Sequence, residues 1–222
     1  MILAIDTATR WTGLALHDGT AVIAEAGWRS INTQTIELSP AIAGLLKRAD
    51  TDSGELKGIA VAIGPGSYTG LRVGLAVAKG IALAHQTPLL GVPTLDIVAA
   101  GFGALDGKLV IVAEAGRTRV CAAVYRWNGR KGWQANAAPI IESWPNLLDT
   151  LADEPITFAG EITLDAAKQI RAANKAYRLA TPAASTRRAG CLAEIGWQRL
   201  RKGQLDDVAS LAPIYLKDPG GN

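Results

Sequence analysis

The sequence predicts an α/β protein with two lobes built on one duplicated plan. Its 222 residues correspond to roughly 1.5 domains of average size, which allows one large domain or two small lobes. The run at 2–16 is echoed at 109–124: each is an apolar strand that ends in an acid, a polar turn and a second apolar run. Strand-like and helix-like segments then alternate in both halves, which is typical of layered α/β proteins with a partly parallel sheet. We place the lobes at residues 1–105 and 106–222, with the last segment packing back toward the first lobe.

The first half opens with three expected strands, because its apolar runs are separated by polar turns such as Asp18-Gly19. Gly58–Ile63 is a continuous apolar run, as in a buried strand, and Pro93 suits the first turn of a helix. In order, we expect strands within 2–16 and at 20–29, a helix at 34–49, a strand at 58–63, a helix at 69–85, a strand at 88–92 and a helix at 93–104.

The second half repeats this order, and its hairpin turn contains Asn128-Gly129. We expect strands within 109–124 and at 131–141, a helix at 143–153, a strand at 156–159, a helix at 161–174, a strand at 176–180 and a helix at 185–202. A β-β-β-α-β-α order that occurs twice resembles the plan of the actin-like, sugar-kinase and Hsp70 ATPase superfamily. The resemblance implies a duplicated actin-like fold, in which each lobe has a mixed sheet flanked by helices.

Composition indicates a folded protein of a reducing compartment. The chain has 23 basic and 20 acidic side chains and is 49% hydrophobic, far from a disordered composition. Its cysteines, Cys121 and Cys191, form no C-x-x-C pair. The opening residues read as a strand rather than a signal peptide, and the apolar stretch at 80–95 is interrupted by prolines and too short to span a bilayer. We therefore expect a cytoplasmic protein with no membrane partner.

Residues 111–222 carry 15 basic and 11 acidic side chains, so the second half is the more basic one. Part of this excess falls on the expected helix 185–202. Its basic residues form either a solvated face, which we favour, or a nucleic-acid patch: Arg187, Arg188, Arg199, Arg201 and Lys202.

The first hairpin turn holds a candidate remnant of a nucleotide site, formed by Asp6, Thr7 and Thr9. ATPases of the superfamily have an acid followed here by glycines, because an anion needs unobstructed backbone N–H groups. This chain has no glycine before Gly13, although the threonine hydroxyls could still donate hydrogen bonds. Asp6 is either a vestigial ligand or a strand-end carboxylate bonded to the adjacent turn, and both interpretations stay open.

The strongest local signal is the glycine-rich run at 64–74, between an expected strand and helix. Glycines allow a tight turn with unusual dihedrals, and Ser67 or Thr69 can cap the exposed amides of the helix. The run matches neither the dinucleotide fingerprint nor a P-loop. Arg72 lies in the first turn, where the helix dipole disfavours a cation. An acidic or phosphate partner is therefore expected for Arg72, with an ordinary surface charge as the alternative.

The helix that follows is apolar on nearly all sides, with Arg72 and Lys79 as the charged residues between 70 and 84. Such a helix must be covered almost completely. Either its own lobe covers it, or one face is left for a partner protein, and we favour the partner. The preceding helix carries an apolar stripe that could join the same surface: Ile36, Ile42, Leu45, Leu46 and Ala49.

Recognisable arrangements of catalytic residues are mostly absent from the sequence. The two histidines, His17 and His85, are not spaced as metal ligands on a helix. Ser67 lies in no G-x-S-x-G elbow. We therefore expect no catalytic residue and no metal site on this chain.

Five segments together resemble the TsaB (YeaZ) family of tRNA threonylcarbamoyladenosine biosynthesis proteins: residues 2–9, 64–74, 78–82, 91–95 and 213–217. The resemblance is dense over 1–100 and thin over 101–210. The run G-P-G-S-Y-T-G-L-R-V-G is specific, because the sibling catalytic family, TsaD, adds an H-x-x-x-H motif that is missing here. Two departures mark a divergent lineage: Gln34 where many members have His, and the run at 114–121 in place of D-A-R-x-G-E-V-Y.

The resemblance implies a non-catalytic subunit that binds TsaD through the helices of its first lobe. It supports threonylcarbamoyl transfer to the adenosine beside the tRNA anticodon, works with the ATPase TsaE and contacts tRNA indirectly. A homodimer through the same surface is expected. The chain alone is expected to bind no cofactor, and ATP is expected at the interface of the complex. The implied interface residues are Gln34, Leu38, Ile42, Leu45, Gly66, Ser67, Tyr68, Thr69, Gly70, Arg72, Val73, Gly74, Val77, Ala78 and Ile81.

An enzyme is the alternative: an ATPase or small-molecule kinase of the same fold, with Asp6 as the acid and the 64–70 loop on phosphate. A third interpretation, a glycoprotein endopeptidase, lacks a nucleophile and a metal site. The interface hypothesis predicts that Gly74→Arg abolishes the TsaD complex while leaving the fold intact.

Overall fold

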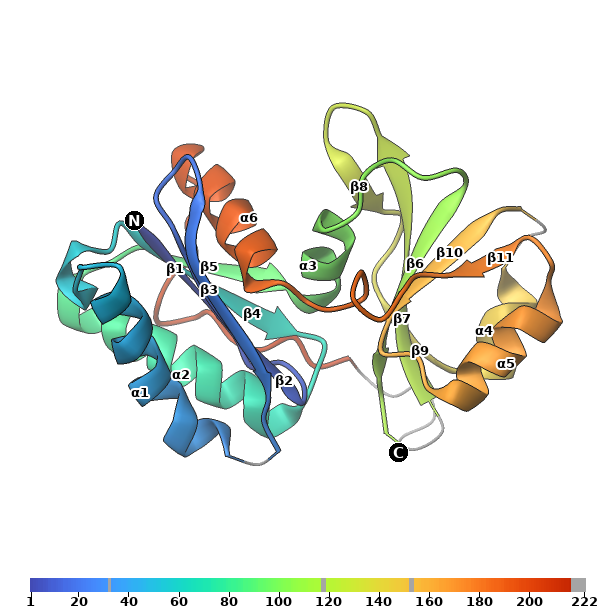
Figure 1. Ribbon diagram of the computed structural model, residues 1–222, viewed down its shortest axis with the longest axis horizontal. Helices are drawn as coiled ribbons and strands as arrows, with labels where there is room; N and C mark the ends of the chain where they lie inside the picture. Colours follow the sequence, from blue (N-terminus) through green and yellow to red (C-terminus); the bar gives the residue numbers. More distant parts are fainter. Residues whose placement is uncertain (32, 117–118, 152–153, 217–222) are drawn as a thin grey trace. The chain divides into compact units, whose positions relative to one another are not determined.

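The computed structural model describes residues 1–31, 33–116, 119–151 and 154–216 (Figure 1). Parts of three sequence features lie outside these residues: the end of the expected helix 143–153, the centre of the 114–121 run, and Lys217 of the C-terminal motif. The chain divides into two compact units. The first is built from Met1–Ile97 and Arg187–Tyr215, and the second from Val98–Thr186 together with Leu216.

The sheet of the first unit has five strands in the order β3-β2-β1-β4-β5. β1 pairs antiparallel with β2 and parallel with β4, β2 pairs antiparallel with β3, and β4 pairs parallel with β5. The mixed sheet therefore starts as a hairpin meander and ends in two parallel crossovers. The strands are β1 (Ile2–Asp6), β2 (Trp11–His17), β3 (Val22–Arg29), β4 (Gly58–Gly64) and β5 (Leu89–Pro93).

Helices cover both faces of this sheet. Residues of a strand point alternately to its two faces, so Leu3 and Ile5 join one core and Ile2 and Ala4 the other. The helices α1 (Gln34–Arg48) and α2 (Tyr68–His85) cover the first face, and α6 (Ala189–Arg201) covers the second. A short 3-10 helix, Ser53–Glu55, precedes β4, and α3 (Thr94–Ala100) follows β5.

The second unit repeats the strand order of the first. Its sheet runs β11-β10-β6-β7-β8, with β9 also paired to β7, and β6 is antiparallel to β7 and parallel to β10. Helices α4 (Trp144–Thr150) and α5 (Leu164–Ala173) contribute to a core with Val110, Val112 and Phe158. The strands are β6 (Lys108–Glu114), β7 (Arg119–Asn128), β8 (Gly132–Ala135), β9 (Ile140–Ser143), β10 (Ile156–Gly160) and β11 (Tyr177–Leu179). The predicted duplicated actin-like fold is confirmed.

Helix α6 differs most from its expected place. It lies in the second half of the sequence, yet it belongs to the first unit, because Ala189, Leu192 and Ala193 form one core with β1 and β4. The chain thus changes units after Ile97 and again after Thr186, not at the expected 105/106 boundary. A second difference is local: the expected strand 131–141 is two short strands, β8 and β9.

No helix in the part of the chain that the structure describes is both long and apolar enough to cross a membrane.

The thiol of Cys121 is expected to be inert in the folded protein. Burial raises its pKa to about 12, and the thiolate is the form that reacts. At pH 8 iodoacetamide should therefore leave Cys121 unmodified, while Cys121 should be alkylated readily in denaturant. Mass spectrometry of the tryptic peptides measures both. Equal rates with and without denaturant would contradict the burial of this side chain.

Candidate functional site

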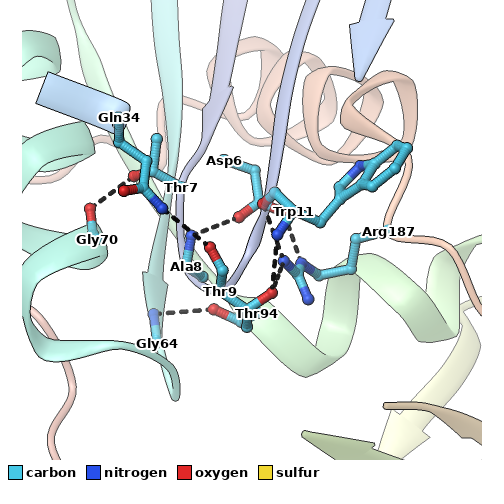
Figure 2. Close-up of polar contacts among 10 residues, drawn as sticks. All are labelled: Asp6, Thr7, Ala8, Thr9, Trp11, Gln34, Gly64, Gly70, Thr94 and Arg187. Carbon is cyan, nitrogen blue, oxygen red and sulfur yellow. Dashed lines mark hydrogen bonds and ion pairs between the residues drawn. The ribbon is translucent and has the colours of Figure 1, made fainter. Parts of the chain in front are cut away.

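The turn after β1 is closed by a buried ion pair between Asp6 and Arg187 (Figure 2). Arg187 Nε donates to Asp6 Oδ2 at 2.7 Å, and Ala8 N donates to Asp6 Oδ1 at 2.9 Å. The Arg187 guanidinium also donates to Thr9 Oγ1 at 2.7 Å. The side chains of Asp6 and Arg187 are 0% and 5% exposed. Asp6 is thus a strand-end carboxylate bonded to its turn, as one of the two interpretations held, and it has a partner that sequence reasoning missed.

Arg187 could not have been found from local sequence, because it lies 181 residues from Asp6. In the sequence it reads as one member of a basic helix. Its role depends on α6 returning to the first unit, where the chain enters the helix directly beside the β1–β2 turn (Figure 2).

The glycine-rich loop packs against the same turn. Ser67 caps α2, since its Oγ accepts from Gly70 N at 3.3 Å, and it is one of the two capping residues that the sequence offered. Ser67 N donates to Ala8 O at 2.6 Å. Thr7 Oγ1 donates to Gly70 O at 2.7 Å, as Figure 2 shows. These hydrogen bonds join the start of α2 to the turn after β1.

The glycines of this loop allow a close approach within the chain itself. A Cβ at Gly66 would overlap Ala8 O, and one at Gly70 would overlap Thr7 O. A Cβ at Gly74, one turn further along α2, would overlap Thr7 Oγ1. Glycine is therefore needed because the helix lies directly on the backbone of the β1–β2 turn.

Gly74→Arg is consequently expected to damage the fold, which corrects the test that the sequence suggested. Forcing a large side chain into a packed interior costs about 1–3 kcal/mol, and sometimes more. We expect the variant to show a lower midpoint in urea, followed by circular dichroism, than the unchanged protein. A variant with an unchanged midpoint would contradict the contact between Gly74 and Thr7.

Among the described residues, Arg72 contacts tyrosines and not the acidic side chain that was one of its two expected partners. Its Nε donates to the Tyr215 hydroxyl at 3.0 Å, and its guanidinium carbon lies 3.8 Å from the centre of the Tyr68 ring. The Tyr215 hydrogen bond raises the pKa of Arg72. Aromatic faces attract cations, so the cation at the start of α2 is balanced by two tyrosines. One of these tyrosines belongs to the C-terminal segment, which Ile214 N anchors to Ile63 O at 2.7 Å.

The expected interface residues fall into three groups by exposure. The exposed group is Gly66, Ser67, Tyr68, Thr69 and Arg72, and the half-buried group is Gln34, Val73, Val77 and Ile81. The buried group is Leu38, Ile42, Leu45, Gly70, Gly74 and Ala78. Members of the buried group offer little surface to a partner, because the apolar stripes of α1 and α2 turn toward their own sheet. Gln34, one of the two departures from the family pattern, donates to Thr9 O at 3.4 Å.

A different set of residues faces outward from α1 and α2. Ile36 and Leu83 are 72% and 69% exposed, and a Cβ at Gly44 or Gly80 would meet no atom within 4 Å. We call this set the α1–α2 surface: Ile36, Pro40, Ala43 and Gly44 on α1, with Val73, Ala76, Val77, Gly80 and Leu83 on α2. The recurrence of small residues at Ala76, Gly80 and Ala84 was the available signal in the sequence.

The basic helix is mostly neutralised within the first unit. Arg187 pairs with Asp6, Arg188 pairs with Glu25 at 2.6 Å, and Arg199 pairs with Asp206 at 3.1 Å. The exposed residues of this basic set are Arg188, Arg201 and Lys202. The solvated-face interpretation therefore fits this helix better than a nucleic-acid patch does. Elsewhere, no group of three or more His, Cys, Asp or Glu side chains among the described residues could hold a metal ion.

Comparisons with known proteins agree with this arrangement. Residues 33–221 match the model of the family described as TsaD, tRNA N6-adenosine threonylcarbamoyltransferase. The chain is 31% identical to the tRNA threonylcarbamoyladenosine biosynthesis protein TsaB of Bacillus subtilis, over 97% of this chain and 93% of that protein. It is 35% identical to TsaB of Escherichia coli, over 60% of this chain and 53% of that protein.

Among solved structures, YeaZ from Pseudomonas aeruginosa has a TM-score of 0.78 and 20% identity, with 96% of this chain and 99% of that chain covered. A second Pseudomonas aeruginosa structure, an uncharacterized protein with similarity to peptidase YeaZ, has a TM-score of 0.80 over 97% of this chain and 99% of that chain. At this identity the structures support the fold, and the sequence relatives support the family. The chain belongs to the TsaB (YeaZ) family of tRNA threonylcarbamoyladenosine biosynthesis proteins.

Proposed function

We propose that this chain is a non-catalytic subunit of the machinery that forms threonylcarbamoyladenosine in tRNA, and that it binds the catalytic subunit TsaD through the α1–α2 surface. Membership of the TsaB family supports a part in this modification. The observation that carries the proposal is that two adjacent helices have exposed apolar side chains, Ile36 and Leu83, and glycines with open space around them, Gly44 and Gly80.

The α1–α2 surface has the chemistry of a helix-packing interface. Fully burying an isoleucine or leucine side chain yields about 1.5–3 kcal/mol, so Ile36 and Leu83 are natural anchors. Gly44 and Gly80 allow the backbone of a facing helix to come close. The match to the TsaD family model supports a partner of related fold, because such a partner presents an equivalent pair of helices. A homodimer would use the same surface, and TsaD would replace the second copy.

The hydrogen bonding of the β1–β2 turn supports a non-catalytic role. Asp6 and Thr9 bind Arg187, and Thr7 binds the backbone of Gly70. These groups are the ones that the alternative ATPase or kinase would need for phosphate and metal. We therefore infer that the chain alone holds no nucleotide. An ATP site at the interface of the complex, assistance from the ATPase TsaE, indirect contact with tRNA and a cytoplasmic location complete the proposal.

Reconstitution with TsaD tests the proposal. The chain should co-purify with TsaD of the same organism, and threonylcarbamoyl transfer to an unmodified tRNA, measured by nucleoside mass spectrometry, should depend on the chain. The isolated chain should not turn over ATP. Failure to bind TsaD would refute the assigned partner, and ATP turnover by the isolated chain would favour the enzyme alternative.

A further inference from the structure

The hairpin between β7 and β8 exposes a ring and two cations at its turn. Trp127 is 40% exposed, and Arg130 and Lys131 are exposed. We call these three residues the tip patch. In Figure 1 the turn lies at an end of the second unit's sheet, away from α4 and α5. The patch belongs to none of the features assigned above, because it lies in the second unit.

The structure of the turn fixes the tip patch. Asn128 pairs with Gly132 across the hairpin. The side-chain oxygen of Asn128 accepts from Arg130 N at 3.2 Å, and its backbone carbonyl accepts from Lys131 N at 2.9 Å. Gly132 has a φ of +70°, a conformation that glycine adopts readily. The turn therefore fixes the backbone at Arg130 and Lys131, and both side chains are exposed to solvent.

Trp127 is supported from beneath by a second tryptophan. Its ring meets the Trp133 ring edge to face at 5.4 Å, and Trp133 Nε1 donates to Gly103 O at 3.0 Å. A Cβ at Gly132 would lie 3.8 Å from the Trp127 ring, so that ring reaches toward the turn. Trp133 is thus anchored by its hydrogen bond, while the Trp127 ring stays partly exposed near Arg130 and Lys131.

The sequence around the tip patch carries charge of one sign. Between residues 115 and 141 the sequence has five basic side chains and no acidic one. Unlike Arg187 and Arg199, the side chains of Arg130 and Lys131 form no hydrogen bond or ion pair with another described residue. Arg126 lies 4.0 Å from Glu154, which also pairs with Lys108. The cations at the tip are therefore free to neutralise an external anion.

We propose that the tip patch binds RNA, with Arg130 and Lys131 on backbone phosphates and Trp127 against a base. Cations on phosphates supply affinity without sequence preference, and an open aromatic ring stacks on any base. The combination fits a nucleic acid better than an acidic peptide, which offers no bases for the ring. The choice of tRNA as this RNA rests on the proposed function, and the contact would be a direct one in addition to those made by TsaD.

Binding of an unmodified tRNA transcript to the full chain tests the proposal, by fluorescence titration at several salt concentrations. Arg130→Gln with Lys131→Gln should lower the affinity at 0.1 M salt by about tenfold or more, and should reduce the slope of log K against log salt by about 1.5–2. Trp127→Ala should lower the affinity by about tenfold with an unchanged slope, since stacking releases no counterions. The matched control is Arg201→Gln with Lys202→Gln at the C-terminal end of α6, which should bind as the unchanged chain does.

Three outcomes would overturn the proposal. The first is the absence of tRNA binding by the unchanged chain at 0.05 M salt. The second is an equal loss of affinity in the tip and α6 variants. The third is a tip variant that keeps its tRNA affinity but loses TsaD, which would assign the patch to a protein. The first two results leave TsaD binding untouched, so they are distinguishable from failure of the proposed function.

Discussion

Replacing Arg187 by methionine is expected to lower the free energy of unfolding by about 3–5 kcal/mol. The Asp6 carboxylate is fully buried, and Arg187 supplies its ion pair. Removing one partner of a buried pair leaves the other charge without compensation, and this costs far more than the pair itself contributes. Thr9 Oγ1 would lose its guanidinium donor in the same variant. Urea denaturation, followed by circular dichroism, measures the loss.

The neighbouring residue supplies the matched control. Arg188 also pairs with a carboxylate, Glu25, but the Arg188 side chain is 64% exposed. Exposed pairs contribute about 0–1 kcal/mol, so Arg188→Met should cost much less than Arg187→Met. Adding Asp6→Asn to Arg187→Met should restore part of the stability, because the uncompensated charge is then gone. Equal losses at positions 187 and 188 would contradict a buried ion pair.

Gly80→Arg is expected to abolish binding to TsaD without damaging the fold. A side chain at Gly80 would meet no atom of this chain within 4 Å, and arginine favours a helix over glycine by roughly 0.8–1 kcal/mol. At the centre of an interface the same side chain would hold the partner helix away, and a loss of about 2 kcal/mol or more corresponds to about 30-fold in affinity. Calorimetric titration with TsaD, together with thermal unfolding, measures both effects.

The result is specific because Gly80→Arg should weaken binding to TsaD while the thermal stability of the chain stays the same or rises. Gly129→Arg is the control, since Gly129 also has open space around its Cβ position but lies in the second unit. This variant should bind TsaD normally. Normal binding by Gly80→Arg would show that the α1–α2 surface is not the TsaD interface.

The sequence predicted features that depend on near neighbours. The strand and helix order of both halves followed from apolar periodicity, and the Ser67 cap followed from its position before a helix. A capping hydroxyl and the amide it binds are only three residues apart, so their contact is set by local geometry.

Features that depend on the assembled sheet were out of reach. The family resemblance implied that Leu38, Ile42 and Leu45 lie at an interface, but an apolar stripe turns to its own core first. The outward side of α2 carries the small residues Ala76, Gly80 and Ala84, which hydropathy does not separate from an ordinary helix surface. Likewise, the contact of Gly74 with Thr7 and the pairing of Arg187 with Asp6 require the folded first unit.

The return of α6 to the first unit has a consequence for synthesis of the chain. A ribosome makes β1 to β5 first, and domains generally fold from the N-terminal end as they emerge. Here the Ile2 and Ala4 face of the sheet stays uncovered until α6 has been made. Asp6 likewise has no ion pair until Arg187 has been made, and Gly91 N cannot donate to Asp206 until that residue has been made. Synthesis of the first unit therefore begins before that of the second unit and ends after it. The second unit can fold while the first unit still exposes an apolar face of its sheet.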